Sequence, residues 1–417
     1  MARRYTAFLV LAAVLPAVLV AGPAMAQLGG QLGLPTALPG GGVAGSLDRL
    51  RSGIGTVLEP VDALGQDLAR MVRARTDRLA AFVRTHRDTV EVDDLGQPAR
   101  AHELLLLDPD DAGLKVAGEA GFALLETGRI DGLDLPYARF ASPSGESLAA
   151  ALRHLRHVLP GRTITADQLH FESGSAGGGK GGAALLAPNG GRIGLVDGGV
   201  LPGPRIVAQA GFAAGAPCPD DHAQAIVSLL RGAGAGAVHV ADVYGRDPAG
   251  GSAFAIARAL GWMAREHVPV VSISLVGPSN PLLARAVAAV LAQGMTVVAA
   301  VGNDGAASPP SYPASYDGVV AVTGIDGRRR VLFEAGHALH LDYAAPGADM
   351  TGIGLDGRTR ALRGTSFAAP LVAARLAAYR ASGADASQSL VRANGEARPA
   401  GARVGRGILC ETCRKGI

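Results

Sequence analysis

Between residues 191 and 380 the chain alternates short apolar runs, rich in β-branched residues, with segments of helical spacing. Apolar runs without a polar face are typical of strands buried on both sides of a parallel sheet, because helices then cover each side. The alternation predicts an α/β fold with a doubly wound, mostly parallel sheet. The expected strands are 193–196, 238–243, 270–273, 295–301 and 319–323, with helices over 222–231, 252–265 and 281–293.

Four polar residues stand at the ends of these strands or at the starts of helices. Asp197 ends the first strand, Asn303 follows the fourth, His222 opens the first helix, and Ser366 starts a helix after a Gly-Thr turn. Functional sites in such sheets lie beyond the carboxyl ends of the strands. A carboxylate, an imidazole and a hydroxyl can together activate a nucleophile, and an amide can donate to an oxyanion. An α/β-hydrolase would need a His after its nucleophile, but no His follows His340.

The motifs around these residues resemble those of the subtilisin-like serine proteases, the subtilases. The serine motif of that family is similar to Gly364-Thr365-Ser366-Phe367-Ala368-Ala369-Pro370. Residues 299–305 with 312–314 resemble its oxyanion segment, 272–278 its substrate-binding strand, and 344–347 a further landmark.

This resemblance implies a serine-type endopeptidase with Asp197, His222 and Ser366 as its catalytic triad and Asn303 in its oxyanion hole. It implies a substrate-binding role for five further residues: Ser274, Leu275, Val276, Gly277 and Gly302. The implied catalysis requires no cofactor. The family often binds structural calcium, but no ligand set for it is recognisable in this sequence.

The chain departs from the family pattern at several positions. Gly198 follows the Asp where the family usually has Ser or Thr, Ala223-Gln224 follow the His in place of Gly-Thr, and only 25 residues separate Asp197 from His222. Val276 stands where the family usually has Gly, which predicts a narrower groove. Two alternatives stay open: an inactive secreted binding protein of the subtilase fold, and a sedolisin-type carboxyl-serine peptidase. The second would need Glu in place of His222 and Asp in place of Asn303.

The N-terminus predicts export. Arg3 and Arg4 precede an apolar run, and residues 24–26 form an A-x-A cleavage site, so 1–26 fit a signal peptide and an exported, periplasmic or extracellular protein. The expected contact with a membrane is through this signal alone. Residues 27–60 form a Gly/Pro-rich linker, and 61–86 carry the spacing of an amphipathic helix that packs on its own domain.

Residues 100–171 predict the order β-α-β-β-α-β of a small α+β, ferredoxin-like domain, with Ser144 capping a helix over 146–158. The resemblance makes 61–171 a propeptide that inhibits and assists folding, ahead of a catalytic domain at 191–417. The Gly-rich run 172–190 lacks a phosphate-loop ending and predicts a disordered tether. We expect self-cleavage near Phe171 or within the tether, leaving a mature enzyme of roughly 230 to 245 residues. The released C-terminal strand would lie beside Ser274–Gly277.

Charge and cysteine content limit the partners. Lys and Arg number 39 against 36 Asp and Glu, so no nucleic-acid partner is expected; the expected partners are polypeptide substrates and the chain's own propeptide.

The three cysteines, Cys218, Cys410 and Cys413, leave at least one thiol unpaired. A small disulfide between the last two is favoured over a zinc site.

Overall fold

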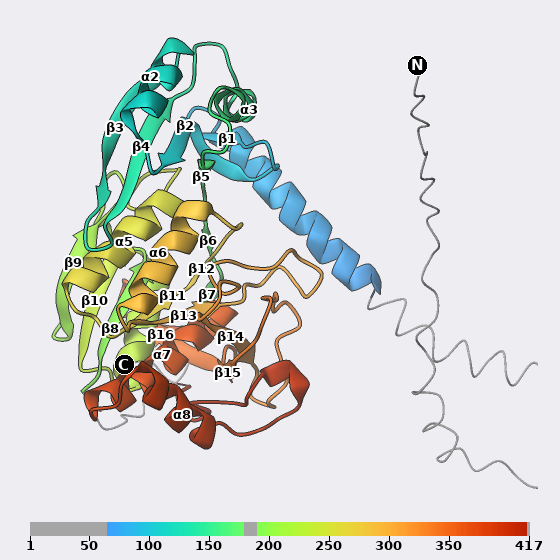
Figure 1. Cartoon of the computed structure of the whole chain (residues 1–417). Helices are drawn as coiled ribbons and strands as arrows, with labels where there is room; N and C mark the ends of the chain where they lie inside the picture. Colours follow the sequence, from blue (N-terminus) through green and yellow to red (C-terminus); the bar gives the residue numbers. More distant parts are fainter. Residues whose placement is uncertain (1–64, 179–189, 415–417) are drawn as a thin grey trace, which may run out of the picture. The chain divides into compact units, whose positions relative to one another are not determined.

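The computed structural model describes residues 65–178 and 190–414, which belong to one compact unit of the chain. The expected signal peptide and linker, and the middle of the tether at 179–189, lie outside these residues. The first described element is a helix over 65–85, drawn in blue in Figure 1. No helix among the described residues has the length and apolar character needed to cross a bilayer.

An antiparallel five-stranded sheet follows this helix. Its order is β1-β2-β4-β3, with β5 paired to the far half of β2. The strands are β1 (Val90–Val92), β2 (Pro98–Leu107), β3 (Ala123–Ile130), β4 (Leu135–Ala141) and β5 (Ile164–Gln168). Helices α2 (Asp111–Glu119) and α3 (Leu148–Val158) complete the expected β-α-β-β-α-β order from β2 to β5. Ser147, and not the expected Ser144, caps α3, because the chain enters the helix two residues later than its spacing suggested.

The second sheet has seven strands, all parallel, in the order β15-β14-β13-β11-β8-β10-β9. They are β8 (Arg192–Asp197), β9 (Ile206–Gly211), β10 (Ala237–Asp242), β11 (Val270–Ile273), β13 (Thr296–Ala300), β14 (Val320–Ile325) and β15 (Tyr343–Pro346). The α/β fold predicted from the sequence is therefore confirmed. Strands β9 and β15 were not expected from the sequence.

Helices cover both faces of this sheet. Alternate strand residues point to opposite sides, so Val298 and Ala300 join the core beneath one pair of helices, while Val297 and Ala299 join the other. The first pair is α4 (Asp221–Gly232) and α7 (Thr365–Ala381), with α8 (Ala386–Glu396) packed on α7; the second is α5 (Ala253–Arg265) and α6 (Pro281–Ala292). Figure 1 shows α5 and α6 side by side.

The antiparallel sheet packs against α5 and α6. The Asp167 carboxylate accepts from the Phe254 N–H at 2.8 Å in the first turn of α5. The Asn280 amide, at the N-cap of α6, donates to the Ala166 carbonyl at 3.0 Å. Arg100 and Asp247 form an ion pair at 2.7 Å. These contacts fix the end of β5, and therefore the direction in which the chain leaves the small domain.

Part of the predicted tether is ordered strand, which corrects that expectation. β6 (Phe171–Glu172) pairs with β12 (Leu275–Val276), and β7 (Ser175–Gly178) pairs with β17 (Thr359–Arg363), which also pairs with β16 (Met350–Ile353). Glycine supplies no side chain but keeps its backbone donors and acceptors, so a Gly-rich segment can still add to a sheet edge. The expected disulfide joins Cys410 to Cys413 after the short helix Ala402–Val404, and Cys218 is a free thiol.

Candidate active site

The three residues proposed as a triad meet at the carboxyl end of the parallel sheet. Asp197 ends β8 and is fully buried, His222 lies in the first turn of α4, and Ser366 lies in the first turn of α7. The His222 Nδ1 is 3.0 Å from the Asp197 Oδ1, and its Nε2 is 3.0 Å from the Ser366 Oγ. A carboxylate can only accept, so in the neutral ring the proton is on Nδ1 and Nε2 is free to accept from the hydroxyl.

Asn303 lies in the loop after β13, on the other side of Ser366. Its Oδ1 accepts from the Thr365 N–H at 3.0 Å, which turns the amide nitrogen toward the carbonyl oxygen of Ser173. The Ser366 N–H donates to the same oxygen at 3.1 Å. Two donors from different elements therefore converge on one carbonyl oxygen of the chain itself. Gly302 holds this loop, since its N–H donates to the Thr365 Oγ1 at 3.1 Å.

The segment that carries this carbonyl lies along the expected substrate strand. Leu275 is opposite Glu172 and Val276 is opposite Phe171 in the antiparallel pairing of β12 with β6. The Ser173 N–H donates to the Ser274 carbonyl at 3.3 Å. Of the five expected substrate-binding residues, Ser274, Leu275 and Val276 thus hold residues 171–173.

The other two expected substrate-binding residues frame this strand. Gly277 lies against the ring of His170, because a Cβ at Gly277 would come within 2.6 Å of that ring. Its N–H donates to the Tyr312 carbonyl at 2.9 Å. A Cβ on Gly302 would meet Val276 at 3.4 Å, so Val276 lies against the Gly302 loop.

Two glycines allow the segment to approach the hydroxyl closely. A Cβ on Gly174 would overlap the Ser366 Oγ and lie 2.8 Å from the Phe367 ring. A Cβ on Gly364, whose φ is +144°, would lie 2.7 Å from the Gly174 Cα. The Ser173–Gly174 peptide group is therefore in contact with Ser366, in space that side chains at either glycine would fill.

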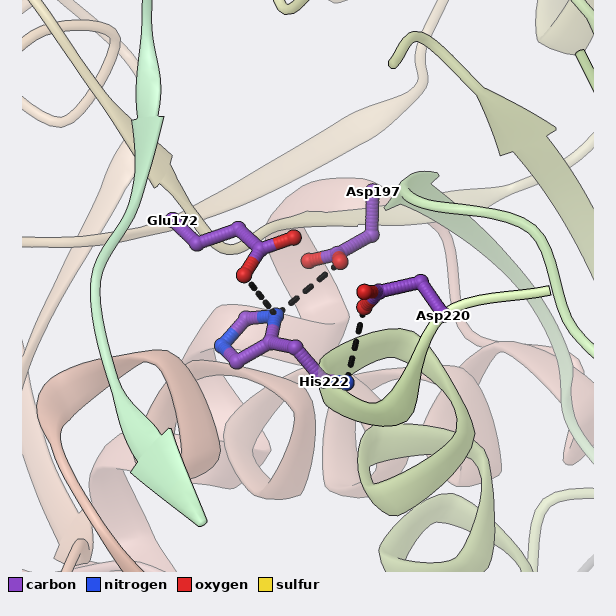
Figure 2. Close-up of side chains that lie close together, drawn as sticks. All are labelled: Glu172, Asp197, Asp220 and His222. Atoms are coloured by element: carbon purple, nitrogen blue, oxygen red, sulfur yellow. Dashed lines mark hydrogen bonds and ion pairs between the residues drawn. The ribbon is translucent and has the colours of Figure 1, made fainter. Parts of the chain in front are cut away.

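Carboxylates surround His222. Glu172 approaches the Nδ1 at 3.9 Å, and Asp220, the N-cap of α4, accepts from the His222 N–H at 2.7 Å (Figure 2). Burial works to lower the pKa of His222, but the negative charges of Asp197, Glu172 and Asp220 outweigh it and raise the pKa to about 9. Burial, together with Asp197 and Asp220, raises the pKa of Glu172 in turn. The site thus favours a protonated imidazole while Glu172 is in place.

The same four side chains are close enough to share a metal ion. One of the ligands would be an imidazole, whereas Ca²⁺ takes oxygen ligands, so this group does not fit structural calcium. Sequence reasoning missed Glu172, Asp220, Ser173 and Gly174 as site residues. Asp220 had a signal, an acidic residue directly before a helix, but the others are recognisable only through long-range pairing.

Comparison with known proteins agrees with this architecture. Residues 208–393 match the profile of the Subtilase family, a range that includes His222, Asn303 and Ser366. Over these residues the chain is similar to the subtilase family. Subtilisin DY of Bacillus licheniformis is 34% identical over 127 residues, 30% of this chain and 46% of that protein. Proteinase T of Parengyodontium album is 36% identical over 110 residues, 26% and 37% of the two chains.

These alignments span about half of each relative or less. Among solved structures, fervidolysin from Fervidobacterium pennivorans, described as a keratinolytic enzyme related to subtilisin, has a TM-score of 0.63 at 15% identity. The match covers 78% of this chain and 62% of that one. At this identity the likeness concerns the fold, and it covers a larger share of this chain than residues 208–393.

Proposed function

We propose that this protein is a secreted serine endopeptidase, made as a precursor, whose first substrate is its own Ser173–Gly174 peptide bond. One observation supports this best: the Ser173 carbonyl oxygen accepts from the Ser366 N–H and the Asn303 amide, beside a hydroxyl that contacts His222. This is the arrangement that a bound peptide needs just before nucleophilic attack.

The chemistry follows from these contacts. The Ser366 Oγ attacks the Ser173 carbonyl carbon while the His222 Nε2 takes its proton, and Asp197 stabilises the imidazolium that forms. The negative charge on the Ser173 oxygen is held by the Ser366 N–H and the Asn303 amide. The bond to Gly174 then breaks as His222 returns the proton to the Gly174 nitrogen. Water, activated by the same imidazole, hydrolyses the acyl-enzyme and frees Ser366.

Residues up to 173 then act as the propeptide. Its sheet packs on α5 and α6, and its last residues occupy the groove as an added strand, so it would inhibit until it dissociates. Export is supported by the sequence of residues 1–26 and by relatives such as the minor extracellular protease of Bacillus subtilis. Catalysis needs no cofactor in this scheme.

Purified precursors test the proposal. Residues 27–417 are produced as wild type, as Ser366→Ala and as Ser387→Ala, a control at an exposed serine in α8. We expect wild type and the control to yield a product that begins at Gly174 and holds 244 residues, 174–417. Ser366→Ala stays full length. Intact mass and N-terminal sequencing read both ends of the cut, and a fluorophosphonate label on Ser366 reports the activated hydroxyl.

Two outcomes would contradict the proposal. Cleavage of Ser366→Ala at the same bond would mean that another protease does the processing. A wild-type protein that is neither cut nor labelled would favour the inactive binding protein of the same fold.

A further inference from the structure

The helix at 65–85 contacts the loop that carries the oxyanion donor. Its Arg75 Nε lies 3.1 Å from the Asp304 Oδ2, and its Arg78 Nη2 lies 2.6 Å from the Oδ1 of the same carboxylate. Asp304 directly follows Asn303 in the chain. Met71 of the helix packs against the next residue, Gly305, where a Cβ would lie 3.0 Å from its sulfur. The helix therefore places two cations beside the residue next to the oxyanion donor.

The same helix also touches the bound segment. The rings of Phe82 and Phe171 stand edge to face, with centroids 5.2 Å apart. Phe171 is two residues before Ser173, so the helix spans from the bound strand to the Asp304 loop. The helix and Phe171 lie before the Ser173–Gly174 bond, whereas Asp304 and its loop lie after it.

A cavity of about 670 Å³ lies beneath the helix. The residues that line it include Arg75, Ser173, Val276, Asp304 and Ser311. The Ser173 hydroxyl donates to the Ser274 carbonyl at 3.0 Å, so this small side chain stays against β12. The space next to the residue before the scissile bond is consequently much larger than that residue requires.

Asp304 carries the charge that remains in this cavity after cleavage. Arg75, Arg78 and Glu172 lie before the scissile bond and leave with the propeptide. Glu334 and Arg363, the other charged residues of the described lining, pair with each other at 2.7 Å. Removal of the propeptide would therefore leave one unpaired carboxylate at the wall of the cavity.

We propose that Asp304, which pairs with Arg75 and Arg78 in the precursor, makes the mature enzyme select Lys or Arg at the residue before the scissile bond. The inference rests on the proposed function and names its substrate class. A long, unbranched basic side chain in this cavity can reach past Val276 and present its charge to Asp304. A guanidinium can bind such a carboxylate through two parallel hydrogen bonds.

Matched peptides test this on the processed enzyme. They are identical except for Arg or citrulline, its uncharged isostere, before the scissile bond. We expect kcat/KM to favour Arg by about 10- to 100-fold, the strength of a charge-assisted hydrogen bond. In Asp304→Asn the ratio should fall to about one, and Asp304→Lys should favour Glu over Gln at that position. Asp317→Asn, at an exposed aspartate, serves as the control that keeps the ratio.

The outcomes distinguish a failure of this specificity from a failure of the proposed protease function. Cleavage of the citrulline peptide without any preference for Arg, or an unchanged ratio in Asp304→Asn, overturns the specificity and leaves the protease standing. Fluorophosphonate labelling of each variant shows that its site is assembled. If wild type cleaves no peptide and takes no label, the proposed function fails and this inference fails with it.

Discussion

Substituting Gly174 by Ala should block self-processing without removing any catalytic group. The added Cβ would overlap the Ser366 Oγ and lie 2.8 Å from the Phe367 Cε2 and 3.2 Å from the His222 Nε2. Real Cβ atoms keep more than 3.0 Å from other heavy atoms, so either the segment or the hydroxyl must move by about 1 Å. A displacement of that size from the attack geometry lowers the rate by about 100-fold.

The assay is the first-order loss of intact precursor, followed by mass at a protein concentration low enough to exclude cleavage between molecules. Gly118→Ala is the matched control, because a Cβ there meets nothing within 4 Å and the residue also belongs to the propeptide. We expect this control to process like wild type. Processing of Gly174→Ala within about threefold of wild type would refute the proposed position of the scissile bond.

Three further predictions concern the site and its pH dependence. Asn303→Ala should lower kcat by about 10²- to 10³-fold with little change in KM, measured on peptide substrates. His222 must be neutral to act as the base, so the rate of precursor cleavage should rise with pH toward the raised pKa of His222, about 9. Glu172→Gln removes a nearby negative charge and should move that rise to lower pH. A stopped time course at each pH measures both rates. His170 is fully buried and burial lowers its pKa to about 4 from 6.5, so acid should weaken propeptide binding between these pH values, by up to about 100-fold in Kd. Titration of Glu172 should change the Kd in the opposite direction, so the effect of His170 is measured as the difference in Kd between wild type and His170→Leu at each pH. Identical curves of Kd against pH for the two proteins would contradict the role of His170.

Much of the α/β domain could be predicted because its sequence signals are local. Each of the three residues is marked by a feature within a few residues of it. Asp197 ends an apolar run, His222 lies at the start of a helix, and Ser366 follows a Gly-Thr turn. The parallel sheet then brings those ends together, since parallel strands share one carboxyl edge. The conformation of each motif depends little on the rest of the chain, so the sequence was sufficient to propose all four residues.

The bound segment could not be predicted in the same way. Which bond meets Ser366 depends on the register of β6 against β12, and register depends on partners about 100 residues away. The Gly-rich composition of 172–190 suggested disorder, yet backbone pairing of β7 with β17 orders its first part. The sequence predicted the region of processing but not which peptide bond lies beside Ser366. Glycine has no side chain whose character could indicate a particular neighbour.

In the proposed scheme, Glu172 makes the same three residues react at different rates in the precursor and in the mature enzyme. In the precursor its carboxylate helps to hold the imidazole of His222 protonated, and a protonated imidazole cannot take the Ser366 proton. Once the segment leaves, the charge of Glu172 no longer raises the pKa of His222, while Asp197, which raises it more, and Asp220 remain. At neutral pH the first cut should therefore be slow, and every later cut, on substrates without an acidic residue at that position, should be faster. A precursor that cleaved itself at pH 7 as fast as the mature enzyme cleaves a peptide with Gln in place of Glu172 would show that this carboxylate does not restrain the base.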